Sequence, residues 1–382
     1  MKRTFNITIV LLLLVAHLAT AENNTLSTRT WTNVSYSTVS ATDKLDIFLP
    51  STGEGPFPVV IWIHGGAFKM GSKSNPQSQA ALNAAGFAVV SIDYRLSTEA
   101  KWPAQLNDLK ACVKFLKTNA TTYALDPNKM ASWGASAGAH LSLMMGAALA
   151  SDPATRIQAT VSWFPPMHFY YMDEDIALSG VSRCTGANGD ANSPESALIG
   201  AQVSLNKALC DAASPTSFVD TLNVSIPLPN FLMMHGGKDC NIGANQSVRF
   251  HNAVTNRFGT AKSQYVFLPN GTHGGGDFTL SSTETTVINF LKAQLLSTAV
   301  PTINAENKLK VSYNSAQKML TVEDESLDMS STKFTILNLS GTVVKSGNLS
   351  SKAIEVSSLK GVYLLKVQND ANYSVTKKII VS

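Results

Sequence analysis

The chain has 382 residues, of which 44% are hydrophobic and 15% are charged, and its formal net charge at pH 7 is +4. The charge is small and no block of like charges occurs, so the balance indicates neither a nucleic-acid partner nor an anionic surface. One hydrophobic core stops growing beyond about 250–300 residues, so this length predicts a large domain accompanied by a smaller one.

The N-terminus has the composition of a secretory signal peptide. Lys2 and Arg3 precede an apolar run at 9–16, and an Ala-Thr-Ala site follows at 19–21. The apolar run is shorter than the roughly 20 residues that a membrane-spanning helix needs. We therefore predict that residues 1–21 are removed, that the mature protein is secreted or displayed at the cell surface, and that it has no membrane span.

Residues 22–300 alternate strand-like with helix-like segments. This alternation predicts an α/β domain with a doubly wound, mainly parallel sheet covered by helices on both faces. Period-2 alternation at 44–50 predicts a strand at the antiparallel edge of that sheet, and helices are expected at 104–118 and 137–149. Continuous apolar runs predict buried parallel strands at 58–64, 87–93, 129–134, 157–164, 231–235 and 264–268.

Two later segments break this rhythm. The stretch 167–216 is rich in Gly, Ser, Asn and Asp, and we interpret it as an insertion over the strand ends. Within 301–382 only short period-2 strands occur, such as 333–337 and 361–367, with turn signals between them. This pattern predicts a small C-terminal all-β sandwich.

The pentapeptide Gly134-Ala135-Ser136-Ala137-Gly138 lies between an apolar strand and an apolar helix. It is the G-x-S-x-G pattern in the strand–turn–helix context of a hydrolase nucleophile. We predict that Ser136 is the nucleophile and that the backbone N–H of Ala137 donates to the substrate carbonyl oxygen. Taken alone, the pentapeptide also fits a Gly-rich turn with a capping serine.

A second glycine-rich motif, His64-Gly65-Gly66-Ala67-Phe68, directly follows an earlier predicted strand. We predict that the N–H groups of Gly66 and Ala67 complete an oxyanion hole with that of Ala137. One such donor is typically worth about 3–4 kcal/mol of transition-state stabilisation. By itself this loop could be only a tight turn, but two such motifs in this order, each after a strand, argue against coincidence.

The general base and its orienting acid are expected after later strands, in the chain order Ser, acid, His. His273 follows the last predicted parallel strand in a glycine-rich loop, from which a base can reach back to Ser136. Asp239 ends the preceding strand. Asp277 is the rival acid, but it lies too near His273 along the chain to orient it from across the sheet. The predicted catalytic triad is therefore Ser136, Asp239 and His273.

Apolar residues close to these loops are candidates for the substrate pocket. Trp163, Phe164 and Met167 follow a predicted strand, and Phe68 ends the glycine-rich loop. Aromatic residues at strand ends often belong to the core instead, and that alternative stays open.

Four cysteines remain to be assigned, and an exported protein can form disulfides. Helical spacing places Cys112 on an apolar face, which favours a small core residue. Among the other three, Cys184–Cys210 is the first choice for a disulfide, and this pairing leaves Cys240 free. No cysteine has metal-site spacing, and we predict neither a metal nor a cofactor.

Several motifs occur together in the first 300 residues: HGGAF at 64–68, SIDYRL at 91–96, WPAQ at 102–105, GASAG at 134–138, SPES at 193–196 and the Asp239 and His273 loops. As a set they resemble the bifunctional feruloyl and acetyl-xylan esterase family, which lies near the hormone-sensitive-lipase-like esterases. The resemblance covers roughly residues 30–295. It implies an α/β-hydrolase that removes acetyl or feruloyl groups from plant polysaccharide such as xylan. The chain departs from the family at Ala67, where a third glycine is usual, and in its own insertion around Cys184.

The C-terminal segment resembles the sorting domain of the type IX secretion system of Bacteroidetes, through 360–367 and 377–381. The resemblance implies an interaction with that secretion machinery. A carbohydrate-binding or spacer sandwich is the alternative, although few aromatics are available there to stack on sugars. The glycosylation sequon at Asn270 adjoins His273, where a glycan would obstruct the site, and this favours a bacterial source.

Two other functions remain open. A secreted serine peptidase could use the same triad and oxyanion hole, although the sequence lacks a large β-domain before residue 30. An inactive hydrolase fold used for glycan binding should have lost a member of the triad, whereas all three are present.

Overall fold

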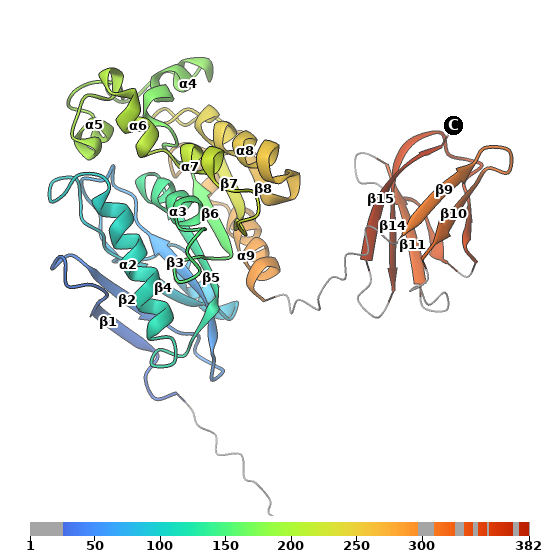
Figure 1. Cartoon of the computed structure of the whole chain (residues 1–382), viewed down its shortest axis with the longest axis horizontal. Helices are drawn as coiled ribbons and strands as arrows, with labels where there is room; N and C mark the ends of the chain where they lie inside the picture. The colour runs from blue at the N-terminus through green and yellow to red at the C-terminus, as the bar shows by residue number, and fades with distance from the viewer. Residues whose placement is uncertain are drawn as a thin grey trace, which may run out of the picture. The chain divides into compact units, whose positions relative to one another are not determined.

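The computed structural model describes the chain as two compact units, one within residues 1–297 and one within 298–382 (Figure 1). The predicted signal peptide, 1–21, lies outside the described residues. No helix in the described part of the chain has the length and apolarity needed to span a membrane. The described residues are 26–296, 309–324, 332–338, 343–349, 351–369 and 374–381.

The first unit is built on an eight-stranded sheet with the order β1-β2-β4-β3-β5-β6-β7-β8. Strands β1 and β2 pair antiparallel with each other, β2 pairs antiparallel with β4, and every other neighbouring pair is parallel. The strands are β1 (Thr30–Ser35), β2 (Lys44–Phe48), β3 (Phe57–Ile63), β4 (Ala88–Ile92), β5 (Leu125–Ala135), β6 (Ala159–Trp163), β7 (Asn230–Gly236) and β8 (Ser263–Leu268).

The six predicted parallel strands all exist, but the predicted edge strand is wrong in position. The segment at 44–50 forms β2, which is antiparallel as expected but is second from the edge. The edge is β1, whose residues are mostly exposed and polar. A strand that buries so little apolar surface leaves almost no period-2 signal in the sequence.

Helices cover both faces of this sheet, which explains the continuous apolar runs. In β3, Val59 and Ile61 join a core that includes side chains of α2 and α3. The alternate residues Val60 and Trp62 join a second core with α1 and α9. The helices are α1 (Gln79–Ala84), α2 (Ala104–Thr118), α3 (Ala137–Ala148), α8 (Asn245–Phe258) and α9 (Ser281–Leu295), with 3-10 turns η3 (Thr260–Lys262) and η4 (Gly276–Thr279).

The connection between β6 and β7 contains the segment predicted as an insertion. It forms short helices, of which α4, α5 and α6 gather at one end of the first unit (Figure 1). The elements are η1 (Phe169–Tyr171), α4 (Met172–Leu178), α5 (Pro194–Ile199), η2 (Val203–Leu205), α6 (Lys207–Ala212) and α7 (Pro215–Thr221).

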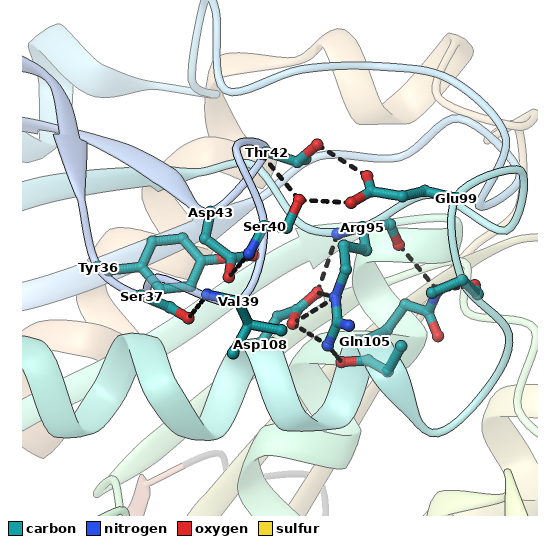
Figure 2. A network of polar contacts seen from close by, with 12 residues as sticks. Tyr36, Ser37, Val39, Ser40, Thr42, Asp43, Arg95, Glu99, Gln105 and Asp108 are labelled. Atoms are coloured by element: carbon teal, nitrogen blue, oxygen red, sulfur yellow. Dashed lines mark hydrogen bonds and ion pairs between the residues drawn. The ribbon is translucent and has the colours of Figure 1, made fainter.

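A polar network holds the loop after β4 against the start of α2 (Figure 2). The guanidinium of Arg95 donates to Asp108 at 2.6–3.1 Å, and the Arg95 backbone N–H donates to the same carboxylate at 2.9 Å. Gln105 donates to the carbonyl oxygens of Arg95 and Ala100 at 2.8 and 2.9 Å. The SIDYRL and WPAQ motifs therefore have a structural role, which is to hold the loop after β4 on helix α2.

The second unit consists of two antiparallel sheets with a shared core, as predicted for the C-terminal segment. One sheet has the order β13-β10-β9 and the other β12-β11-β14-β15. Leu320 and Ile354 of the first sheet and Ile336 and Leu365 of the second are buried in one cluster. The strands are β9 (Lys310–Asn314), β10 (Met319–Glu323), β11 (Thr332–Leu337), β12 (Val343–Asn348), β13 (Ala353–Glu355), β14 (Gly361–Asn369) and β15 (Ser374–Val381).

Candidate active site

Ser136 lies in a sharp turn between β5 and α3, with φ 56° and ψ −123°. The flanking glycines make this turn possible. A Cβ atom on Gly134 would lie 2.1 Å from the carbonyl oxygen of Gly138, and one on Gly138 would lie 2.0 Å from that of Ile63. Because such contacts are impossible for any larger residue, the sequence pattern around Ser136 follows directly from the turn.

The helix behind Ser136 is buried on every side. In α3 every residue from Ala137 to Ala147 is buried. Ser136 is the N-cap residue, so the first N–H groups of a fully packed helix point toward the site. The hydroxyl and the N–H of Ala137 are therefore held on a rigid element.

The structure brings together the three side chains predicted as the triad. Nε2 of His273 lies 3.0 Å from Oγ of Ser136, and Nδ1 of His273 lies 2.8 Å from Oδ2 of Asp239. The three residues come from the loops after β8, β5 and β7. The carboxyl ends of neighbouring parallel strands meet at one edge of the sheet, which explains how residues 137 positions apart converge.

Asp239 is buried and held as a carboxylate. Its Oδ1 accepts hydrogen bonds from the backbone N–H groups of Asn241 and Ile242, at 2.9 and 3.0 Å. Burial pushes the pKa of Asp239 upward, but the hydrogen bond from His273, the charges of His273 and His235 and the backbone N–H of Ile242 together hold the pKa below its ordinary value. The carboxylate is thus present at neutral pH to orient the imidazole.

Asp277, the rival acid, has a different partner. Its Oδ2 accepts a hydrogen bond from the backbone N–H of Asn270 at 2.8 Å. This bond closes the loop that carries His273.

The predicted oxyanion loop has an unusual backbone. Gly66 has φ 115°, and the next two residues, Ala67 and Phe68, have φ 54° and 59°. The backbone N–H of Ser97 holds the loop by donating to the carbonyl oxygen of Phe68 at 2.7 Å. Within the described parts of the chain, no hydrogen bond uses the backbone N–H of Gly66, Ala67 or Ala137. Three donors are therefore available to a substrate oxygen.

His64 supports this loop from behind. Its ring stacks on Tyr94 with centroids 4.4 Å apart, and the Tyr94 hydroxyl donates to the His64 carbonyl oxygen at 3.1 Å. Burial lowers the pKa of His64, although the Gly65 carbonyl and the charge of Asp93 oppose the shift. His64 is therefore a neutral structural residue.

A cavity of about 320 Å³ opens beside Ser136 and His273. Of the four predicted pocket residues, only Phe68 lines it. The predictions for the other three are wrong because those side chains face the interior of the domain. Trp163 and Met167 are buried in two different cores. Phe164 packs against the His273 ring, with centroids 4.6 Å apart, and so positions the imidazole.

One wall of the cavity comes from residues 185–195 of the β6–β7 connection. We refer to this segment as the 185–195 wall. It lies within the insertion predicted over the strand ends, but it has no apolar periodicity, and none of its residues was assigned to the pocket. The one signal available was the SPES motif, whose Glu195 lines the cavity.

The predicted disulfide is wrong in one partner. Cys184 pairs with Cys240, with Cα atoms 5.3 Å apart, and the Cys184 N–H donates to the Cys240 carbonyl at 3.1 Å. Cys210 is buried in the core on α6, as a free thiol. Cys112 is also free and buried, as predicted. The pairing was missed because it depends on the loop after β7 folding back toward Cys184.

The described residues contain no group of three His, Cys, Asp or Glu side chains that could hold a metal ion. The arrangement of nucleophile, imidazole, carboxylate and free N–H donors is suited to acyl transfer.

The parallel sheet, the turn at Ser136 and the loops at its strand ends define an α/β-hydrolase. The BD-FAE family model matches residues 45–254, more than half of the chain, and the chain belongs to this family. The resemblance predicted from the motifs is thereby confirmed. Ser136 and Asp239 lie inside the matched segment, and His273 lies beyond it. Residues 305–382 match a second model, described as a secretion system C-terminal sorting domain.

Curated relatives include two Mycobacterium tuberculosis proteins. Esterase LipQ is 30% identical over 56% of this chain and 50% of its own length. Esterase LipC is 29% identical over 57% of this chain and 53% of its own length. The chain therefore spans about half the length of these relatives.

Two solved structures are similar at the same level of identity. A truncated carbohydrate esterase from gut microbiota is 29% identical, with a TM-score of 0.61 over 70% of this chain and 97% of its own. A bifunctional GH43-CE protein of Bacteroides eggerthii is 29% identical, with a TM-score of 0.57 over 70% of this chain and 38% of its own.

Proposed function

We propose that the protein is an exported serine carboxylic-ester hydrolase that removes acetyl or feruloyl groups from plant polysaccharide. The observation that carries the proposal is the hydrogen-bonded chain Ser136–His273–Asp239 beside a cavity, in a chain of an esterase family. The esterase names of its relatives point to the same reaction class.

In the first half of the proposed reaction, Oγ of Ser136 attacks the carbonyl carbon of the ester while its proton passes to Nε2 of His273. The negative charge that develops on the carbonyl oxygen is stabilised by the N–H groups of Gly66, Ala67 and Ala137. Asp239 stabilises the imidazolium that forms. When the carbon–oxygen bond of the ester breaks, His273 returns the proton to the leaving alcohol and an acyl-serine remains.

In the second half, His273 takes a proton from water as the water oxygen attacks the acyl-serine carbonyl. The bond to Oγ breaks, Ser136 regains its proton from His273, and a carboxylic acid leaves. Atoms and charge balance with water as the only co-reactant, so the reaction needs no cofactor.

The polysaccharide part of the proposal rests on the family and on the solved carbohydrate esterase that is 29% identical. Export rests on the sorting-domain match at residues 305–382, which implies an interaction with type IX secretion machinery at the outer membrane of a Bacteroidetes-type bacterium.

The test is a substrate panel containing acetylated xylan, feruloylated arabinoxylan, p-nitrophenyl esters and dipeptide amides, with Ser136→Ala as the blank. We expect release of acetate or ferulate by the wild-type protein only. Cleavage of the amides in preference to the esters would instead identify a peptidase. The absence of any turnover would favour a glycan-binding role.

A further inference from the structure

Two buried side chains in the cavity beside Ser136 have polar atoms without partners. Glu195 is 5% exposed and Asn188 is 7% exposed, and both line the cavity. Within the described part of the chain, neither Oε2 of Glu195 nor Nδ2 of Asn188 has a hydrogen-bond partner. Because an unpaired buried polar group destabilises a fold, these two atoms need an explanation.

The unpaired atoms are not a result of a poorly held loop. The backbone N–H groups of Asn188 and Gly189 each donate to the Asp173 carboxylate at 2.8 Å. Further along the 185–195 wall, Ser193 caps α5 by accepting from the N–H of Ser196 at 3.0 Å. The backbone of the wall is thus anchored near both residues, and both residues line the cavity.

The surroundings of Glu195 leave its carboxyl group able to act as donor or acceptor. Burial raises the pKa of Glu195 to about 7, the charge of Asp173 acts in the same direction, and the backbone N–H of Glu195, Lys69 and Ser193 oppose the shift. Near neutral pH both protonation states are populated. A carboxyl group of this kind, on the same cavity wall as an amide, matches a partner that can itself donate and accept.

We propose that Glu195 and Asn188 form a subsite for a hydroxyl group of the substrate. The inference depends on the proposed esterase function and specifies which esters the site selects. The substrate hydroxyl donates to Oε2 of Glu195 and accepts from Nδ2 of Asn188, so both orphaned atoms gain a partner. This chemistry is shared by the ring hydroxyls of an acetylated sugar and by the phenol of a feruloyl group.

A subsite of this kind discriminates strongly between esters with and without the hydroxyl, because an ester without it leaves two buried polar groups unpaired. Sites built to bind a hydroxyl reject the analogue that lacks it by up to about 10⁴- to 10⁵-fold. For a cavity open to solvent we expect a smaller preference in kcat/KM, roughly 10- to 100-fold.

The experiment measures kcat/KM for two matched pairs of esters. The sugar pair is a monoacetylated methyl xyloside and tetrahydropyran-3-yl acetate, and the phenol pair is methyl 4-hydroxycinnamate and methyl cinnamate. The variants are Glu195→Met and Asn188→Ala. Their controls are Glu174→Met, at an exposed position on α4, and Asn256→Ala, at an exposed position on α8 that does not line the cavity.

We expect the wild type and both controls to prefer the hydroxylated ester in one pair, and we expect each subsite variant to bring that ratio close to one. The pair that responds identifies the source of the hydroxyl. A ratio that both variants leave unchanged, or a wild type that hydrolyses esters without any such preference, overturns the subsite alone. A wild type that hydrolyses none of the four esters overturns the proposed function as well.

Thermal unfolding separates a binding role from a structural one. Glu195→Met removes a buried carboxyl group that lacks a full set of partners, so the melting temperature should stay equal or rise. A marked fall in melting temperature, with the ester preference intact, would show that Glu195 serves the fold instead.

Discussion

At Ser136 and in the Gly66–Phe68 loop the backbone adopts positive φ angles, which residues other than glycine rarely take. Ser136 and Ala67 carry a Cβ in these conformations and still keep them. Such strain persists only where the surroundings fix the backbone, as the buried helix α3 and the bond from Ser97 to Phe68 do here. The site is therefore pre-formed before substrate arrives.

Ser136→Ala should leave the fold intact and lower kcat for ester hydrolysis by about 10⁴- to 10⁶-fold. Alanine keeps the Cβ, so the backbone strain is the same, and only the proposed nucleophile is lost. Steady-state kinetics on a p-nitrophenyl ester, with circular dichroism to verify folding, checks this. Near-normal turnover by a folded Ser136→Ala would contradict the role proposed for this serine.

Asp239→Asn should reduce kcat by about 10⁴-fold, because an amide at this position favours the wrong tautomer of His273. Asp277→Asn is the matched control. It should reduce kcat less than roughly tenfold, since the Asp277 carboxylate accepts a hydrogen bond from the backbone of Asn270 and not from His273. If Asp277→Asn proved the more damaging change, Asp239 would not be the orienting acid.

The proposed triad was easier to predict than the residues around it. Ser136, Asp239 and His273, which the structure brings together, were proposed because a sharp turn and a fixed chain order leave a local pattern. The insertion that contains the 185–195 wall was predicted, but none of the wall residues was assigned to the pocket, and Trp163 and Met167 were assigned to it wrongly. Cavity walls depend on long-range packing, for which a single sequence has no periodic signal.

At the level of elements, the disulfide joins the 185–195 wall to the loop after β7. Cys240 directly follows Asp239, and Cys184 directly precedes the wall. Neither this disulfide nor strand β1 could be predicted from the sequence, because both depend on contacts between segments with little apolar surface. The buried parallel strands were predicted well because helices on both faces make every residue apolar.

The double variant Cys184→Ser/Cys240→Ser should be less stable by about 2–4 kcal/mol and should have a lower kcat/KM. We expect the loss of activity because, without the disulfide, the 185–195 wall and the loop that carries Asp239 are no longer joined by a covalent bond. Chemical denaturation and kinetics measure the two effects. A reducing agent should reproduce them in the wild type and leave the double variant unaffected. An unchanged kcat/KM in the double variant would mean that the Asp239 loop is held without the bond.

Helix α3 carries the buried residue His140. Burial lowers the pKa of His140 to about 4, although its hydrogen bond to the Ala213 carbonyl opposes the shift. The pKa of His140 is thus lower in the folded protein than in the unfolded chain, where it is about 6.5. The unfolded chain therefore binds a proton more readily, so the stability that is present above pH 6.5 is lost as the pH falls toward 4. The full loss amounts to roughly 3 kcal/mol. The difference in unfolding free energy between wild type and His140→Phe should therefore shift by about this amount between pH 7 and pH 4. A constant difference would show that His140 does not contribute to acid sensitivity.

At the scale of the whole chain, each unit has its own hydrophobic core. Every residue proposed to act in catalysis lies in the first unit. The second unit matches the sorting-domain model, and the described residues that line the cavity belong to the first unit. The abrupt change from α/β alternation to short strands was enough to predict an all-β fold for the C-terminal segment.

Deletion of residues 305–382 should leave turnover unchanged on both a soluble aryl ester and insoluble xylan, because we propose that this segment serves export. Kinetics with and without the segment on both substrates provide the check. A loss confined to insoluble xylan would instead mean that the segment binds carbohydrate. A loss on both substrates would make it part of the catalytic domain.

The glycines on either side of Ser136 also bear on how this protein can evolve. A side chain at 134 or 138 would collide with backbone atoms, whereas the 185–195 wall is a connection outside the sheet. We therefore expect adaptation to a new ester to proceed mainly through the wall, while the turn stays constant. Deep mutational scanning under selection for a new substrate should find its gains at 185–195 and none at Gly134 or Gly138.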